Sequence, residues 1–377
     1  MNILVISHFQ NDGSPYVSFV HDQVLAFKAL GHNVAVVSPV VRIKKEAEVY
    51  KGVIKRTIDG IKIYYPRYFS LSNYGIYGLN TFLGFLGTKK TFKRVINEFK
   101  PDIIHAHTIL FDGAIGAKLR AMYNIPVIIT THGSDTIKAI EHNKSAYITN
   151  ICKNVNAIVA VSSKLKRLLM NAEPVLKPYV VCNGFNSQYC MEKQKKCHSI
   201  IQVSNLIKQK NVDITIRAVA ELKKDYDDVE LTIVGEGPEK QNLLDLCQEL
   251  NILDSVIFTG QISNKDVLNL MSQTEIFVMP SIKEGLGIVY LEAMASGCVA
   301  IGTKGEGIED IIVNGNNGFL IEDINPKLVA DYIIKCFNNA EYERQIISAG
   351  KDTALKLTWL NNASQYIDIF ARVLSEV

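Results

Sequence analysis

Short apolar runs alternate with helix-like segments around residues 275 to 302. The run 275–280 is apolar at its central positions, as in a strand buried on both faces of a sheet. A second run of strand length follows at 298–302, directly after Gly297, a residue type that favours the left-handed cap of a helix. The pattern predicts a strand, a turn at Gly285-Leu-Gly287, a helix that ends at Gly297, and a second strand.

The same alternation extends over most of the chain. Apolar positions recur at helical spacing from 17 to 30 and from about 212 to 224, and a hairpin is expected around 59–60. Strands that alternate with helices indicate an α/β protein with parallel sheets, and 377 residues suit two domains. Further strands are predicted at 2–7, 33–39, 101–106, 126–131, 157–162, 179–183, 199–204, 230–235 and 256–260.

Composition and charge narrow the class of protein. Apolar content of 47% and charged content of 21% are typical of a soluble globular chain. Seven cysteines without paired spacing indicate reduced thiols in the cytoplasm, and neither a signal peptide nor an apolar run of ~18 residues is found. Residues 1–185 hold 23 Lys and Arg against 11 Asp and Glu, whereas residues 186–377 hold 18 against 27. This asymmetry predicts different partners for the two halves.

Candidate chemistry lies between the two strands of the central segment. The amides of residues 286–289 and the positive end of the helix dipole attract anions, and a diphosphate fits that description. Glu292 lies roughly 7.5 Å along the axis from Gly287, where its carboxylate can accept two hydrogen bonds from the diol of a ribose. Glu284 is interpreted as the contact to the group that the diphosphate carries. This order of parts describes a nucleotide-diphosphate sugar, although two surface glutamates on an ordinary αβ unit would give the same spacing.

The segment 281–297, with its glutamates eight residues apart, resembles the retaining glycosyltransferases of family four. These enzymes have the GT-B fold, in which two Rossmann-like doubly wound domains face each other across a cleft. The resemblance covers nearly the whole chain and is strongest from 199 to 322. It implies an N-terminal acceptor-binding domain at 1–185 and a C-terminal donor-binding domain at 186–357. A last helix at about 358–377 is expected to pack back on the first domain.

Residues of the family's donor site carry over position by position. Lys210 matches a lysine that contacts the donor phosphates, whereas Asn205 replaces the usual arginine and Asn211 the usual glycine. Lys208 is a second candidate cation that could compensate for the missing arginine. Ile262 belongs to the segment whose backbone the family lays against the nucleotide base. The donor site implied by the resemblance consists of Asn205, Lys210, Ile262, Gly285, Leu286, Gly287, Ile288 and Glu292.

Two further groups are implied in the first domain. His132 follows the strand 126–131 at the edge where ligands gather in such sheets, and the family places a histidine there beside the donor sugar. His132 and Glu284 are therefore the expected catalytic residues. Gly13 and Ser14 are assigned to a loop that faces the donor diphosphate or the acceptor, while Asp135 either caps the next helix or touches a sugar.

Three other signals are interpreted as structural or incidental. His105 and His107 alternate with apolar residues on a strand and offer two ligands for a metal but no third. The pair Asp225-Tyr-Asp227 has the form of a metal-binding motif but precedes a strand, away from the expected ligand edge. The glycines at 235 and 237 lack the third glycine of a dinucleotide fingerprint. No metal and no cofactor are expected.

An aromatic and aliphatic stretch at 78–87 precedes a basic helix at 88–100. Such a combination is typical of a protein that rests on an anionic membrane surface. An amphipathic helix with a solvated basic face explains the same pattern, and the sequence leaves both readings open.

The resemblance and the residues together indicate a metal-independent, retaining glycosyltransferase. It would move a hexose or N-acetylhexosamine from a nucleotide-diphosphate sugar, with UDP favoured, to a saccharide acceptor in cell-surface polysaccharide synthesis. A polyprenyl-diphosphate-linked acceptor would place the enzyme on the inner face of the membrane. The alternatives are transfer to a small soluble acceptor, a nucleotide-sugar 2-epimerase of the same fold, and a non-catalytic sugar-nucleotide sensor.

Overall fold

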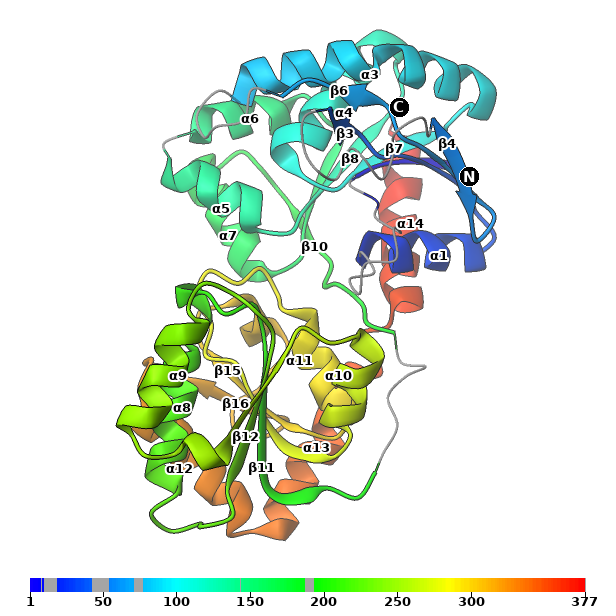
Figure 1. Ribbon diagram of the computed structural model, residues 1–377. Coiled ribbons are helices and arrows are strands. Elements are labelled where there is room, and N and C mark those ends of the chain that lie inside the picture. Colours follow the sequence, from blue (N-terminus) through cyan, green and yellow to red (C-terminus); the bar gives the residue numbers. More distant parts are fainter. Residues whose placement is uncertain are drawn as a thin grey trace. The chain divides into compact units, whose positions relative to one another are not determined.

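The computed structural model describes residues 1–7, 9, 19–42, 54–70, 77–142, 144–186 and 193–376. Its chain divides into two units, each with its own mostly or entirely parallel sheet (Figure 1). Unit 1 comprises Met1–Gly184 together with Trp359–Val377, and unit 2 comprises Phe185–Thr358. Both are Rossmann-like α/β units, so the predicted fold class of two such domains is confirmed.

In the described ranges of unit 1, the sheet has eight strands in the order β10-β9-β8-β7-β1-β2-β5-β4. All neighbours are parallel except β4 and β5, which are joined by Asp59 and Gly60, both with positive φ. This is the hairpin that the sequence predicts. The strands are β1 (Asn2–Ile6), β2 (Asn33–Val37), β4 (Lys55–Ile58), β5 (Ile61–Tyr64), β7 (Ile103–Ala106), β8 (Val127–Thr131), β9 (Ala157–Ala160) and β10 (Tyr179–Val180), with β3 (Val40–Val41) and β6 (Arg67–Tyr68) in a separate pair.

The last helix, α14 (Trp359–Ser375), packs against α1 (Phe19–Ala29) within unit 1 (Figure 1). Gln23 donates a hydrogen bond from Nε2 to Oδ1 of Asn362 at 2.7 Å, and the rings of Phe27 and Phe370 lie 5.6 Å apart. The other helices among the described residues of unit 1 are α3 (Tyr77–Phe99), the π-helix η1 (Ile109–Gly113), α4 (Ala114–Tyr123), α5 (Ser134–Glu141), α6 (Ser145–Lys153) and α7 (Ser163–Ala172).

Helix α3 is continuous through the stretch that the sequence divides into an aromatic part and a basic helix. The sequence suggests a division because Gly84 and Gly87 lie inside this stretch, and glycine ordinarily weakens a helix. A Cβ at Gly84 would lie 2.5 Å from the ring of Phe111, and one at Gly87 would lie 2.6 Å from Cβ of Tyr68. Both glycines therefore permit close packing on β6 and η1. Among the described helices, none combines the length and the apolar character that a membrane crossing requires.

Unit 2 has a six-stranded parallel sheet in the order β13-β12-β11-β14-β15-β16. The central segment has the predicted form, with β14 (Thr274–Val278), α11 (Ile288–Ala295) and β15 (Val299–Thr303) in succession. Gly297 ends the helix with a φ of +80°. The remaining strands are β11 (Lys196–Val203), β12 (Glu230–Val234), β13 (Val256–Gly260) and β16 (Phe319–Ile321).

Helices cover the sheet of unit 2 and close its core. Buried side chains such as Ile200, Leu231 and Ile276 of the strands pack with Ile216 and Val219 of α8 (Val212–Leu222). Within the described part of unit 2 the other helices are η3 (Lys208–Lys210), α9 (Lys240–Glu249), η4 (Leu253–Ser255), α10 (Asn264–Met271), η5 (Gly307–Asp310), α12 (Pro326–Phe337) and α13 (Ala340–Ala354).

Candidate functional site

The turn between β14 and α11 presents backbone amides at a helix start. Gly287 is the N-cap of α11, with a φ of +82° and no side chain to cover the first turn. Leu286 is 2% exposed, so it offers only its backbone, and Gly285 is buried as well. Ile288 is half-buried as the first residue of the helix. Because the first amides of a helix have no partner within it, this turn can bind an anion.

Lys210 and Glu284 form an ion pair beside that turn. The lysine Nζ donates a hydrogen bond to a carboxylate oxygen of Glu284, and both side chains are largely buried, with 19% and 22% exposed. Two further bonds hold the η3 turn against the loop after β14. Ile282 donates its amide proton to the carbonyl of Gln209 at 2.8 Å, and Asn211 donates from Nδ2 to the carbonyl of Pro280 at 2.7 Å. The structure thus brings together a cation and a carboxylate that the sequence places 74 residues apart.

The loop after β15 packs against the same turn and hydrogen-bonds to it. The amide of Glu284 donates to a carboxylate oxygen of Glu306 at 2.6 Å. A Cβ at Gly307 would lie 1.8 Å from the carbonyl oxygen of Gly285, so only glycine fits there. Neither Glu306 nor Gly307 is among the site residues that the sequence predicts. The signal for them was Gly305-Glu-Gly307, which follows a strand at the same sheet edge.

Glu292 lies on the second turn of α11 and is half-buried. Asn264 donates a hydrogen bond from Nδ2 to Oε1 of Glu292 at 3.3 Å. Asn264 begins α10 two residues after Ile262, which is half-buried in the loop that follows β13. The loop after β13 and the helix α11 therefore meet at this glutamate.

Asn205 follows β11, and its side chain is exposed. The glycines after β12 lie close to this segment. A Cβ at Gly235 would lie 1.9 Å from the carbonyl oxygen of Ser204, and one at Gly237 would lie 2.3 Å from that of Leu206. These two glycines let the loop after β12 approach the backbone on either side of Asn205. This close packing explains why glycine is required at both positions without dinucleotide binding.

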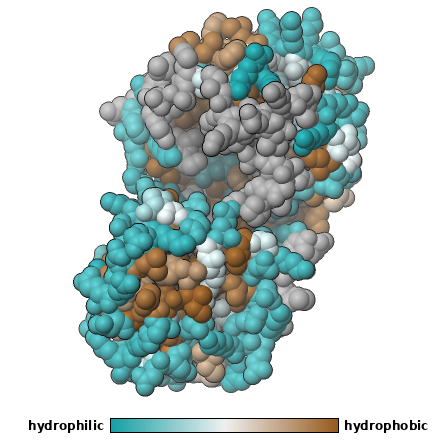
Figure 2. Space-filling view, in the orientation of Figure 1, coloured by the Kyte–Doolittle hydropathy of each residue, from teal (hydrophilic) through white to brown (hydrophobic). Residues whose placement is uncertain are grey.

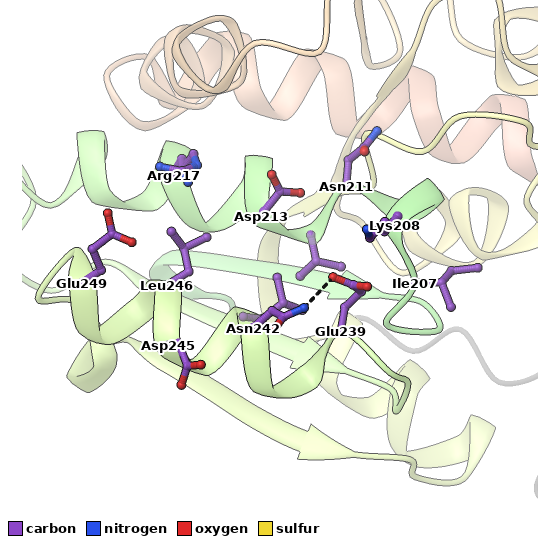
Figure 3. A pocket seen from close by; sticks show the side chains of 12 residues that line it. Ile207, Lys208, Asn211, Asp213, Arg217, Glu239, Asn242, Asp245, Leu246 and Glu249 are labelled. Atoms are coloured by element: carbon purple, nitrogen blue, oxygen red, sulfur yellow. Dashed lines mark hydrogen bonds between the residues drawn. The ribbon is translucent and has the colours of Figure 1, made fainter.

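Lys208 lines a groove between α8 and α9 with a volume of about 570 Å³ (Figure 3). Glu239, the N-cap of α9, and Glu249, its last residue, line the same groove, and Asn242 donates to Glu239 at 3.0 Å. Lys210, by contrast, pairs with Glu284 and does not line this groove. The two lysines of η3 thus lie in different environments, Lys208 at the groove and Lys210 beside Glu284.

In unit 1, His132 directly follows β8 and contacts a second histidine. Nδ1 of His107 and Nε2 of His132 lie 3.1 Å apart, and the two ring planes are nearly parallel, at 4° to each other, with their centroids 5.4 Å apart. The ring of Phe19 lies 4.4 Å from that of His132. Burial lowers the pKa of His132 to about 3 and that of His107 well below its usual value, so both imidazoles are neutral at pH 7.

Four further residues of the first domain were singled out from the sequence, namely Gly13, Ser14, Asp135 and His105. Gly13 and Ser14 lie outside the described residues. Asp135 is the second residue of α5, whose N-cap is Gly133 with a φ of +107°. His105, expected to be structural, is fully buried, and its Nε2 lies 2.8 Å from Oγ1 of Thr130.

Comparison with known proteins identifies the family of this fold. The model of the glycosyl transferases group 1 matches residues 191–353, and the model of glycosyltransferase family 4 matches residues 17–189. The N-acetyl-alpha-D-glucosaminyl L-malate synthase of Bacillus anthracis is 29% identical over 294 residues, which cover 73% of this chain and 76% of that protein.

Two solved structures share the fold over nearly the full length. Sucrose-phosphate synthase from Thermosynechococcus elongatus has a TM-score of 0.81 at 18% identity and covers 100% of both chains. HepE from Anabaena, solved in complex with UDP, has a TM-score of 0.76 at 16% identity, with 99% of this chain and 100% of that chain covered. The two family models adjoin each other at the boundary between the units. This chain is therefore a glycosyltransferase that belongs to family four (glycosyl transferases group 1), with the GT-B fold.

Proposed function

We propose that this enzyme transfers a hexose or N-acetylhexosamine, with retention of anomeric configuration, from a UDP-sugar that binds to unit 2. The observation that carries the proposal is the Lys210–Glu284 pair beside the start of α11. The amides of this helix and Lys210 would hold the diphosphate. Glu284, released from the lysine, would accept hydrogen bonds from hydroxyl groups of the sugar.

Glu292 is the proposed contact to the ribose. Its place on the second turn of α11 suits a group that follows the diphosphate toward the base, and Asn264 orients one of its carboxylate oxygens. The backbone at Ile262, next to that asparagine in the loop, would face the base. Asn205 stands where the family has an arginine, so the diphosphate would depend more strongly on Lys210.

The proposed reaction is attack by the acceptor on the same face from which the diphosphate departs. Lys210 and the helix amides would stabilise the negative charge that develops on the leaving group, which requires no metal ion. His132, a neutral imidazole, would position the sugar by a hydrogen bond. The covalent alternative needs a carboxylate beneath the sugar ring, for which Glu284 and Asp135 are the candidates.

The proposed acceptor is a saccharide linked to a polyprenyl diphosphate at an anionic membrane surface. Three large apolar side chains of α3 are exposed, namely Leu79, Phe82 and Leu86, with exposed fractions of 41%, 48% and 53%. They follow one another at helical spacing on one face. Figure 2 shows apolar residues over the end of α3 where the helix begins and hydrophilic residues over its other end.

Lysines continue that face of α3. Lys89, Lys90 and Lys93 are exposed on the later turns of the helix. An apolar patch followed by cations suits a bilayer surface, because the apolar side chains can enter the interface while the lysines contact anionic lipid headgroups. A small soluble acceptor would give these residues no such use. The enzyme would then act in the cytoplasm, peripherally on the inner face of the membrane.

The test is a panel of UDP-, GDP-, ADP- and dTDP-sugars, screened first by thermal shift and then for products with and without acceptor. We expect a UDP-sugar to stabilise the protein and to yield product only when a lipid-linked saccharide is supplied. An altered sugar nucleotide formed without acceptor would identify the 2-epimerase. Binding with neither transfer nor hydrolysis would identify a sensor, and transfer to a small sugar alone would identify a soluble acceptor.

A further inference from the structure

Gln202 is a fully buried polar residue in the sheet of unit 2. It is the next-to-last residue of β11, and its side chain is 0% exposed. β11 is an inner strand, between β12 and β14, and the preceding residues Ile200 and Ile201 are buried and apolar. Position 202 lies near the carboxyl end of this strand, which is the end at which ligands bind in such sheets.

The side chain of Gln202 bonds to the backbone of Lys210. Its Nε2 donates a hydrogen bond to the carbonyl oxygen of Lys210 at 3.0 Å. A carbonyl can only accept, so this bond determines which end of the amide faces η3. Within the described residues, the other end of the amide, Oε1, is buried and has no hydrogen-bond partner. An unpaired buried oxygen is unfavourable, and an apolar side chain of similar size would avoid it. The bond to Lys210 therefore explains why a glutamine occupies this position.

Two other bonds hold η3, and both join it to the loop after β14. They are the bond from the amide of Ile282 to the carbonyl of Gln209 and the bond from Asn211 to the carbonyl of Pro280. The same loop carries Glu284, whose carboxylate is proposed to exchange the lysine for the sugar when the donor binds. The bond from Gln202 differs from these two, because it joins η3 to an inner strand of the sheet.

We propose that Gln202 is a positioning residue for Lys210. It holds the backbone of this lysine, so that the ammonium group stays in place for the diphosphate after Glu284 is released. Gln202 does not contact the donor itself, because it is fully buried. The inference rests on the proposed function, in which Lys210 binds the diphosphate. Its consequence is specific, since Gln202 strengthens the binding of the phosphates and has no effect on the nucleoside.

The test compares UDP with uridine, which lacks the phosphates. Calorimetry measures the affinity for UDP, and ligand-observed NMR measures that for uridine. Gln202→Met keeps the size of the side chain and removes its hydrogen-bond donor. It should weaken UDP about fivefold or more, while the affinity for uridine changes less than about twofold. Gln202→Asn is one carbon too short to reach the carbonyl, so it should have the same effect and replaces Gln202→Met if that variant does not fold.

Thr215→Val is the matched control and should leave both affinities unchanged. Thr215 is also 0% exposed in unit 2, and its hydroxyl has no hydrogen-bond partner among the described residues. The substitution therefore alters a buried polar group of the same unit without removing a bond to η3.

A double-mutant cycle with Lys210→Ala separates positioning from general damage. Gln202→Met should cause no further loss of UDP affinity in the Lys210→Ala background, because the glutamine acts only through that side chain. A further loss there would overturn the inference, as would equal losses for UDP and uridine in Gln202→Met alone. Wild-type UDP affinity in Gln202→Met would overturn it as well and leave the proposed donor site intact. A wild type that binds neither UDP nor uridine would instead overturn the proposed function together with this inference.

Discussion

Nζ of Lys210 donates a hydrogen bond to the carboxylate of Glu284, although the two residues belong to η3 and to the loop after β14. The pair lies beside the start of α11, where free amides favour a negative group. A diphosphate that binds there offers the lysine a new anionic partner and frees the glutamate. Lys210 would then contact the phosphates of the donor, and Glu284 would contact its sugar.

Gly307→Ala should distort the proposed donor site, although Gly307 is not itself proposed to contact the donor. The added Cβ would lie 1.8 Å from the carbonyl oxygen of Gly285, so the turn before α11 must shift. We expect UDP to bind at least about tenfold more weakly, a loss of about 1.4 kcal/mol, measured by calorimetry. Gly78→Ala is the control, because its Cβ would meet nothing closer than 3.9 Å. Equal UDP affinity in Gly307→Ala and the wild type would contradict the assigned place of the turn.

The stability of the protein should fall as the pH is lowered below about 6.5, the ordinary pKa of histidine. Burial lowers the pKa of His105 to about 3, so between these two values the unfolded chain binds a proton that the folded chain does not. Each such group contributes a slope of about 1.4 kcal/mol per pH unit, and stability rises with pH across this window.

Replacement of His105 by asparagine should flatten that dependence. Thermal unfolding of His105→Asn and wild type at pH 5, 6 and 7 measures the difference in slope. His142→Asn serves as the matched control, since this side chain is exposed. An identical pH dependence for His105→Asn and wild type would show that His105 does not carry the effect.

Part of this architecture could be predicted from the sequence, because the elements concerned follow one another directly along the chain. The segment from β14 to β15 keeps its apolar runs, its glycines and its helix within about thirty residues, so periodicity alone predicts the unit. The hairpin at Asp59 and Gly60 is equally local. Gly84 and Gly87 show what local patterns do not predict. These glycines are needed within α3 because Phe111 and Tyr68, which are distant in the sequence, pack closely against them.

The site was harder to foresee, because its contacts join the ends of different strands. His107 follows β7 and His132 follows β8, and these strands are parallel neighbours. Strand order was not available from the sequence, so the two histidines were assigned separately. Glu306 was missed for the same reason, since β15 lies next to β14 and brings its loop to Glu284.

Charge reversal of Lys89, Lys90 and Lys93 to glutamate should release the enzyme from vesicles that contain anionic lipid. Each lysine near such a surface contributes about 1 kcal/mol, and the attraction falls with salt. Arg94 should matter less, because it pairs with Glu98 on the same helix at 3.6 Å. Co-sedimentation at low and high salt is the measurement.

Two controls separate charge from surface apolarity in that experiment. Lys224→Glu changes an exposed lysine of unit 2 and should not alter sedimentation. Phe82→Ser should weaken binding even at high salt, since it removes an exposed ring from α3. A wild-type protein that stays in the supernatant at low salt would reject the membrane surface and favour a soluble acceptor.

Transfer should persist in excess chelator. The charge on the departing diphosphate is assigned to Lys210 and the amides of α11, which need no divalent ion. Initial rates with EDTA, and after addition of Mg²⁺ or Mn²⁺, should agree within about twofold. Complete loss with EDTA and recovery with a metal would mean that a cation, and not Lys210, neutralises the leaving group.

Titration calorimetry with UDP tests the account most directly, because it separates the two glutamates of the proposed donor site. Glu292→Ala should weaken UDP about tenfold or more, since it removes the contact to the ribose, a charge-assisted bond of about 1.5–3 kcal/mol. Glu284→Ala should bind UDP at least as tightly as the wild type, because it frees Lys210 for the diphosphate, yet it should abolish sugar transfer. Equal losses of UDP affinity in both variants would contradict the division of the site into a nucleotide end and a sugar end.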